Sequence, residues 1–179
     1  MGIISIVALG IALTSQYVFG LDPCVLCIYQ RWPYAIVIFL GLLASIAQIY
    51  SDGSLITELD EVEFGEKRDR QGKVRNAGFM LIIGITFLSN SVIAAYHSGV
   101  ERHWWKSFLE GCAVPKLEGD MEDIIKNLQM RDAARCDEIP WADPILGLSM
   151  ANYNVIICFG LAIAAFTSAK LILQANKTH

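Results

Sequence analysis

Residues 76–100 read NAGFMLIIGITFLSNSVIAAYHSGV and contain no aspartate, glutamate, lysine or arginine. At about 1.5 Å of rise per residue, a helix of this length crosses the roughly 30 Å hydrocarbon core of a bilayer. Three further stretches, 2–21, 32–51 and 144–169, are equally free of these charges. The sequence therefore predicts an all-α integral membrane protein whose four transmembrane helices form one bundle.

The composition agrees with this fold class and excludes others. Hydrophobic residues make up 54% of the 179 residues and charged residues 18%, which is too apolar for an ordinary soluble domain. A soluble α/β enzyme would need strands alternating with amphipathic helices, and neither pattern is present. The net charge is −4 and no basic stripe carries interleaved aromatic residues, so we expect no nucleic-acid partner.

The distribution of charge predicts how the chain crosses the membrane. One membrane domain is expected over residues 1–179, with spans at approximately 3–21, 25–50, 76–98 and 145–169. Basic residues cluster in the connection 52–75 just before the third span, and basic residues near span ends favour the cytoplasmic side. This connection and both termini are therefore predicted to be cytoplasmic, and 99–144 to face outside. Because 52–75 mixes both charge signs without an apolar period, we expect it to be a solvated loop.

The predicted outer loop carries two apolar signals. The first signal is a set of apolar residues spaced as on one face of a helix: Met121, Ile124, Ile125 and Leu128. It predicts a short amphipathic helix that lies on the membrane or packs on the bundle. The other is tryptophan gathered near the outer boundary, at Trp32, Trp104, Trp105 and Trp141. These rings are typical of an interfacial aromatic belt, and they would also suit a site for a hydrophobic ligand.

The cysteines divide between the outer side and the membrane. Cys24 and Cys27 form a C-x-x-C pair, Cys112 and Cys136 lie in the outer loop, and Cys158 lies well inside the last span. An even number of cysteines on the oxidising side favours disulfides over free thiols. Cys158 is expected to behave as a small buried apolar residue.

The surroundings of the C-x-x-C pair favour a reactive thiol. Asp22 is placed to cap a helix beginning at Pro23, so that both thiols would lie in the first turns, where free N–H groups and the helix dipole lower the pKa of a thiol. Arg31 lies on the same helix face, four residues after Cys27. It either extends to the lipid headgroups or faces the cysteines, where it would stabilise a Cys27 thiolate or hold an oxygen-bearing acceptor.

The loop pair leaves three chemistries open. A disulfide between Cys112 and Cys136 could be a structural staple, or it could pass electrons to the C-x-x-C by thiol–disulfide exchange. A metal site that adds His97 or His103 to the outer cysteines is the third alternative, and a less favoured one, because the loop pair lacks a short C-x-x-C spacing of its own. We therefore expect no metal.

Several ordered motifs resemble one known family, the bacterial disulfide bond formation protein B (DsbB) family. Residues 23–31, PCVLCIYQR, match its first-loop signature. The later matches come in the same order: Tyr96-His97, then Cys112, then Arg135-Cys136-Asp137, then Pro140-Trp141 and Gly147-Leu148-Ser149-Met150-Ala151. The likeness covers all four predicted spans. The charged segment 52–75 departs from the family by its length.

This resemblance implies a quinone-coupled thiol oxidase of the bacterial inner membrane that reoxidises a periplasmic, thioredoxin-like dithiol oxidase of the DsbA type. It implies that the partner's thiolate attacks Cys112 and releases Cys136, which then attacks Cys24 and frees Cys27. Cys27 beside Arg31 would donate to a membrane quinone, ubiquinone or menaquinone. His97 is a weaker candidate for the quinone site, with a satisfied interfacial histidine as the alternative.

Two other functions remain open at this stage. A vitamin K epoxide reductase-like quinone reductase also uses cysteine pairs on a helix bundle, but its C-x-x-C is expected late in the chain, whereas here it comes first. A non-enzymatic membrane adaptor, stapled by disulfides or binding a metal, would hold the same cysteines without turnover.

Overall fold

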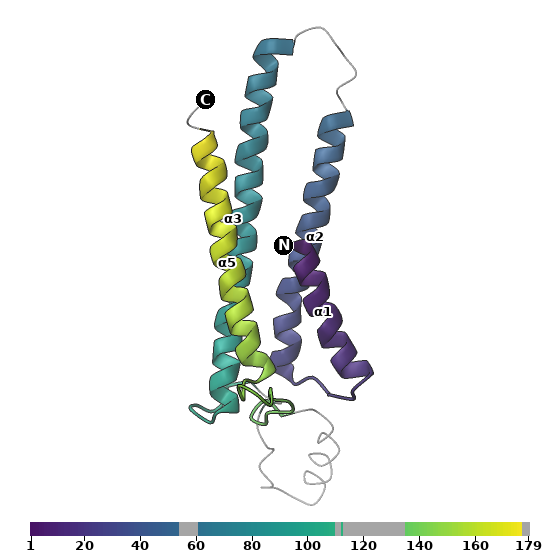
Figure 1. Cartoon of the computed structure of the whole chain (residues 1–179), viewed down its shortest axis with the longest axis vertical. Helices are drawn as coiled ribbons and strands as arrows, with labels where there is room; N and C mark the ends of the chain where they lie inside the picture. The colour runs from purple at the N-terminus through teal and green to yellow at the C-terminus, as the bar shows by residue number, and fades with distance from the viewer. Residues whose placement is uncertain (54–60, 110–111, 113–134, 177–179) are drawn as a thin grey trace, which may run out of the picture.

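The computed structural model describes residues 1–53, 61–109, 112 and 135–176. In this part of the chain the elements are four helices, named in the figures α1 (Gly2–Tyr17), α2 (Val25–Gly53), α3 (Glu61–Glu101) and α5 (Met150–Ala175). They run alternately up and down the molecule, with α3 and α5 side by side and α1 against α2 (Figure 1). The described residues thus confirm the all-helical prediction.

Three of these helices are long and apolar enough to cross a membrane. The apolar spans are Val25–Ala47, Arg70–Glu101 and Met150–Ala175, of 23, 32 and 26 residues. α1 has 16 residues, which at about 1.5 Å each falls short of a roughly 30 Å core. The fourth crossing near 3–21 therefore stays a prediction.

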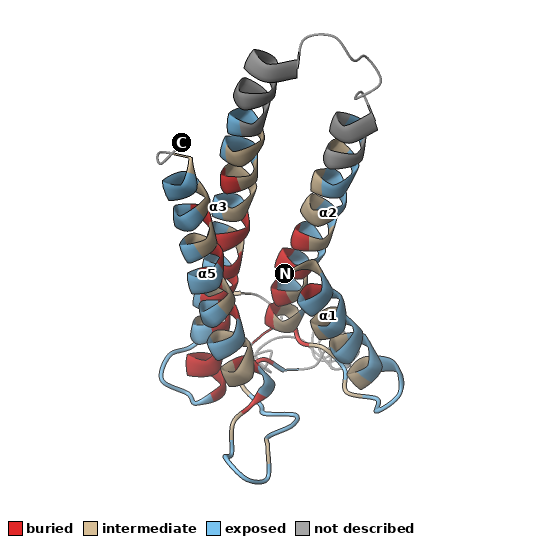
Figure 2. Ribbon diagram, turned by 45° about the horizontal axis from the view of Figure 1, so that its top comes forward, coloured by how far each residue is buried: buried red, intermediate tan, exposed pale blue. Residues whose placement is uncertain are grey.

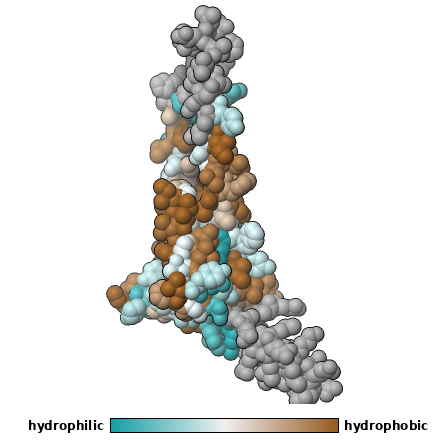
Figure 3. All heavy atoms as spheres, turned by 90° about the vertical axis from the view of Figure 1, so that its right-hand side faces the viewer, coloured by the Kyte–Doolittle hydropathy of each residue, from teal (hydrophilic) through white to brown (hydrophobic). Residues whose placement is uncertain are grey.

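The outward faces of the helices are strongly apolar. Phe39, Ile85 and Phe159 are each more than half exposed, and brown hydrophobic residues dominate the middle of the face drawn in Figure 3. An apolar surface of this extent is rare on a soluble monomer and typical of a lipid-facing one. The chain is therefore a multi-pass membrane protein by its surface as well as its length.

The core is formed where α2, α3 and α5 meet. Phe87 of α3 is fully buried, and its ring packs edge-on against Tyr34 of α2 with centroids 6.0 Å apart. α5 offers mainly small side chains to this core, Cys158, Ala162 and Ala165, all buried (Figure 2). Small residues let membrane helices approach closely, which is why α5 packs tightly on α3.

Two helix ends differ from the predicted span limits for local reasons. α1 ends before Gly20, which has a left-handed φ of +66°, and Leu21 N–H returns to the Ser15 carbonyl. α5 begins at Met150 because Ser149 is its N-cap, accepting from Asn152 N–H. The predicted starting point of the last span, residue 145, therefore lies in the turn that precedes α5.

Most of the charged segment 52–75 is helical, where a solvated loop was expected. α2 continues to Gly53 and α3 already begins at Glu61; residues 54–60 lie outside the described part. The sequence places an acidic residue four positions before a basic one at Glu63/Lys67 and Glu66/Arg70, a spacing that stabilises helices. The sequence spacing therefore favoured a helix there, which the expectation of a loop overlooked.

The segment after α3 returns to the same end of the molecule as residues 18–24 (Figure 1). The amphipathic helix predicted at 121–128 lies outside the described residues. The four tryptophans are exposed, as an aromatic belt requires, and the Trp105 ring stacks on Tyr96 while its Nε1–H donates to the Tyr96 carbonyl at 3.1 Å.

Candidate active site

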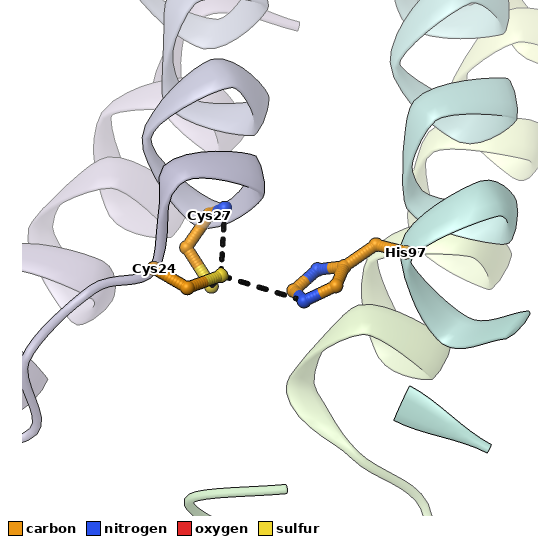
Figure 4. A group of neighbouring side chains, drawn as sticks. All are labelled: Cys24, Cys27 and His97. Atoms are coloured by element: carbon orange, nitrogen blue, oxygen red, sulfur yellow. Dashed lines mark hydrogen bonds between the residues drawn. The ribbon is translucent and has the colours of Figure 1, made fainter. Parts of the chain in front are cut away.

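The C-x-x-C pair lies where α2 begins (Figure 4). The Cys24 backbone oxygen accepts from Ile28 N–H at 3.1 Å, and its Sγ accepts from Cys27 N–H at 3.3 Å. A side chain that accepts from the third helical N–H acts as an N-cap. Cys24 therefore caps α2, and the prediction that Asp22 caps a helix beginning at Pro23 is wrong. The free N–H groups and the helix dipole at this position favour a thiolate.

The two sulfur atoms of the pair are in contact but differ in exposure. Sγ of Cys24 and Sγ of Cys27 lie 2.9 Å apart; Cys24 is buried and Cys27 is half-buried. The hydrogen bond donated by the Cys27 thiol, opposed by burial and assisted by His97, lowers the pKa of Cys24 to about 5. In the reduced pair the negative charge is thus favoured on Cys24, whereas the sequence left both thiols open and suggested a Cys27 thiolate only if Arg31 faced the cysteines.

His97 reaches this pair from α3 (Figure 4). Its Nε2 lies 3.4 Å from Cys24 Sγ and 3.7 Å from Oε1 of Glu101, one helical turn further on. All three residues are buried. Glu101 in turn accepts a hydrogen bond from the hydroxyl of Ser149, the N-cap of α5, at 2.5 Å. The start of α2, the end of α3 and the N-cap of α5 are therefore linked through Cys24, His97, Glu101 and Ser149.

We expect Cys24 to remain ionised in mildly acidic solution. A thiolate exists above its pKa, so its ultraviolet absorbance should persist from neutral pH down to about pH 6 and disappear as the pH falls through about 5. The measurement is a titration of reduced wild type minus reduced Cys24→Ser. Protein unfolded in detergent serves as the control, since its Cys24 should titrate near the ordinary thiol value. A folded-state transition in that alkaline range would contradict the expectation.

The loop cysteines join the same end of the molecule. Cys112 and Cys136 form a disulfide with an S–S distance of 2.03 Å, and both are buried. They pack in one apolar cluster with Cys24, Leu26 and Val100. The disulfide that both the staple and the electron-relay alternatives require is therefore present. It packs in the same cluster as Cys24 of the C-x-x-C pair, with which a relay would have to exchange.

Arg31 is held between α1 and α2. Its Nη1 donates to Gln16 Oε1 at 2.7 Å and its Nη2 to the Ala12 carbonyl at 3.5 Å. It follows Cys27 by one helical turn and is half-buried. The contacts described for this guanidinium are thus to α1.

The chain is similar to known proteins over most of its length. A family model described as disulfide bond formation protein DsbB matches residues 1–168. Among curated relatives, disulfide bond formation protein B of Stutzerimonas stutzeri is 28% identical over 167 residues, covering 89% of this chain and 84% of that protein. An uncharacterised protein of Rickettsia prowazekii is 30% identical over 161 residues, covering 89% and 78%. No solved structure matches.

The chain belongs to the DsbB family. Disulfide bond formation protein B of Azoarcus sp. is similar as well, 26% identical over 162 residues, which cover 86% of this chain and 78% of that protein. As a member of the DsbB family the chain is a membrane oxidoreductase of disulfide bond formation, which confirms the resemblance and the predicted enzyme class.

The spacing of the two sulfur atoms suits thiol–disulfide chemistry, as membership of the DsbB family implies, better than it suits a metal centre. Sγ of Cys24, Sγ of Cys27 and Nε2 of His97 lie within 4.8 Å of one another, a donor set that a soft cation could accept. Two sulfurs bound tetrahedrally at about 2.3 Å from zinc stand about 3.8 Å apart. The observed 2.9 Å is about 0.9 Å shorter than this separation, so the pair would have to open to hold zinc in this way.

Sequence reasoning missed several polar residues of this DsbB-family site. Glu101 closes the charge-free stretch of α3, and Gln30 and Asn154 lie inside apolar spans. Gln30 Nε2 lies 2.9 Å from His97 Nδ1, and Gln30 Oε1 accepts from Asn154 Nδ2 at 2.6 Å. Polar side chains at similar depth in different spans were the available signal, because such residues usually pair with one another inside a membrane bundle.

Proposed function

We propose that this chain is a quinone-coupled disulfide oxidase that reoxidises a periplasmic, thioredoxin-like dithiol oxidase of the DsbA type. The observation that carries the proposal is the single buried cluster containing Cys24 and the Cys112–Cys136 disulfide. Direct exchange between two pairs needs sulfur atoms that can approach each other and a thiolate to attack. The packing of the second pair against the first supports such exchange.

The proposed relay moves two electrons through both pairs. The partner's thiolate attacks Cys112 and forms a mixed disulfide, and Cys136 leaves as a thiolate. The partner's second thiolate then displaces Cys112 and departs oxidised. In the same cycle Cys136 attacks Cys24 of an oxidised Cys24–Cys27 pair, so that Cys27 leaves as a thiolate, and Cys112 displaces Cys24 to restore the loop disulfide. The partner dithiol is oxidised and the C-x-x-C pair is reduced, with two protons retained or released.

The residues around Cys27 fit a membrane quinone. A flat apolar molecule with two carbonyl oxygens needs an apolar surface, a hydrogen-bond donor and a sulfur within reach. Cys27 and Arg31 lie one turn apart on α2, beside the exposed side chains of Ile28 and Trp32. When bound, the quinone would supply a sink for two electrons and two protons. Cys24, held as a thiolate beside Cys27, is placed to close the Cys24–Cys27 disulfide as the electrons leave.

Replacing Arg31 with methionine should weaken quinone use. Loss of a charged donor to a carbonyl oxygen is expected to raise the quinone concentration for half-maximal rate about tenfold, with little change in partner affinity. Steady-state quinone reduction measures both. As a matched control, Gln16→Leu keeps the guanidinium but removes the shorter of its two hydrogen bonds to α1, and should give a smaller change. Equal quinone dependence in Arg31→Met and wild type would remove Arg31 from the quinone site.

The proposed location is the bacterial inner membrane, with four spans, both termini in the cytoplasm and the cysteine pairs at the periplasmic surface. The basic residues before Arg70–Glu101 support this orientation, since they lie at the opposite end of α3 from His97. Labelling of single introduced cysteines from either side of the membrane would test it.

The test of the proposed function is quinone reduction by purified protein with a reduced thioredoxin-like dithiol partner and either ubiquinone or menaquinone. The expected result is partner oxidation that depends on quinone and continues over many turnovers. Folded protein that keeps its disulfide and shows no quinone-dependent oxidation would refute the oxidase function and favour a stapled membrane adaptor. The early C-x-x-C also argues against the vitamin K epoxide reductase-like order.

A further inference from the structure

A row of hydrogen bonds leads from the interior of the bundle to Cys24. Tyr34 O–H donates to Asn154 Oδ1 at 2.5 Å, and Asn154 Nδ2 donates to Gln30 Oε1 at 2.6 Å. Gln30 Nε2 lies 2.9 Å from His97 Nδ1, and His97 Nε2 lies 3.4 Å from Cys24 Sγ. The residues come from α2, α3 and α5, so the row also ties these three helices together.

The orientation of the two amides in this row follows from their neighbours. The Tyr34 hydroxyl oxygen lies 2.5 Å from one atom of Asn154, and the Cys158 sulfur lies 3.2 Å from the same atom. A separation of 2.5 Å falls within the range of an O–H···O hydrogen bond and below that of N–H···O, so this atom is the amide oxygen. The NH₂ group of Asn154 then faces Gln30, so the atom of Gln30 that accepts its hydrogen bond is the amide oxygen. Gln30 is left with its NH₂ group facing His97.

This orientation decides which nitrogen of His97 carries the proton. The Gln30 NH₂ group can donate only to an unprotonated Nδ1. Both an Nδ1-protonated ring and a doubly protonated ring would set two donors against each other at 2.9 Å in a buried site. The neutral ring protonated at Nε2 satisfies every contact, and that N–H points at the Cys24 sulfur.

We propose that Gln30 is a positioning residue that holds His97 in the Nε2-protonated form, with Asn154 fixing Gln30, so that His97 donates a hydrogen bond to the Cys24 thiolate. For its catalytic meaning this inference rests on the proposed function of Cys24. The effect on Cys24 itself needs neither a partner nor a quinone. Donation from His97 adds to that from Cys27 in lowering the pKa of Cys24.

The other titratable groups that face Cys24 act in known directions. The Cys27 sulfur on α2 lies 2.9 Å from it and donates once Cys24 is ionised, and Glu101 on α3 places a carboxylate beyond His97. Glu101 accepts from Ser149, so its oxygen is already partnered and competes weakly for the Nε2 proton at 3.7 Å. The Cys24 sulfur at 3.4 Å is the nearer acceptor.

The first measurement is the ¹⁵N NMR spectrum of His97 in reduced wild type at neutral pH, assigned by comparison with His97→Asn. The chain has three histidines, which keeps the spectrum simple. The expected pattern is a protonated Nε2 and an unprotonated Nδ1. A protonated Nδ1 would overturn the proposal without any variant of Gln30.

The second measurement compares Gln30→Leu with Asn90→Leu. Gln30→Leu removes the donor to Nδ1 and should give a mixture of the two ring tautomers. The thiolate absorbance of Cys24 should then titrate about one pH unit higher than in wild type. Well below the wild-type midpoint, this shift corresponds to about tenfold less thiolate. Asn90→Leu is the matched control, because Asn90 is equally buried but bonds the Gln30 backbone carbonyl and Cys158, not the Gln30 amide. It should leave the ring and the titration unchanged.

Three outcomes contradict the proposal: an unchanged tautomer in Gln30→Leu, an unchanged Cys24 titration in that variant, or equal changes in Asn90→Leu. Failure of the proposed oxidase function is distinguishable from all three. In that case the wild-type tautomer and the low Cys24 titration would remain while quinone-dependent oxidation was absent.

Discussion

Replacing Cys27 with serine is expected to lower steady-state oxidation of the dithiol partner by at least about a thousandfold, while each protein still oxidises one equivalent of partner. The reason is that the Cys112–Cys136 disulfide stays intact and accepts one pair of electrons. Without Cys27, Cys24 has no partner thiol with which to form a disulfide. Counting oxidised partner molecules after acid quenching and alkylation gives the stoichiometry.

Cys112→Ser is the matched comparison for this experiment. It leaves the C-x-x-C pair intact but removes the atom that the partner is proposed to attack, so no equivalent should be oxidised at all. Repeated turnover by Cys27→Ser would contradict the two-pair relay, as would a stoichiometric burst in Cys112→Ser.

The largest expected loss of stability comes from Phe87→Ala. Phe87 is fully buried and contacts the Tyr34 ring and the small residues of α5. In a membrane the lipid is as apolar as the core, so the loss arises mainly from the cavity and the broken ring contact, about 3 kcal/mol in free energy of unfolding. Reversible unfolding by sodium dodecyl sulfate in mixed micelles is the measurement.

Leu88→Ala is the control for this prediction. Leu88 follows Phe87 on α3 but is 39% exposed on the apolar outer surface, so its truncation creates no enclosed cavity. We expect a change well under that of Phe87→Ala. Equal losses in the two variants would mean that the α2–α3–α5 core does not hold the bundle together.

The all-helical fold could be predicted from sequence because charge-free stretches of this length leave few alternatives. The ends of the helices could not. α1 stops at a left-handed Gly20 inside an apolar run, and α3 begins at Glu61 inside a charged one. Hydropathy reports where lipid contacts the chain, whereas helix ends depend on caps, turns and the spacing of individual charges.

At the site, the sequence singled out the cysteines and His97, whose catalytic roles stay predictions, but not the arrangement that orients them. The DsbB-like motifs point to sulfur chemistry at residues 24–31 and around Cys112 and Cys136. Glu101, Gln30 and Asn154 come from three different helices, and only the fold brings them together. The thiolate is favoured at Cys24 chiefly because the Cys27 thiol donates to it, with His97 assisting, and these contacts could not be read from the sequence.

The capping of α2 by Cys24 links the oxidation state of the enzyme to the order of a helix. Interactions between two sites are reciprocal, so whatever stability the helix end gives to the sulfur anion, the anion gives back to the helix end. Once Cys24 enters a disulfide its negative charge is lost, and the first turn of α2 loses part of its anchor. Each catalytic cycle would then loosen and retighten the turn that carries Cys27, so backbone hydrogen exchange at residues 25–28 becomes a direct reporter of redox state.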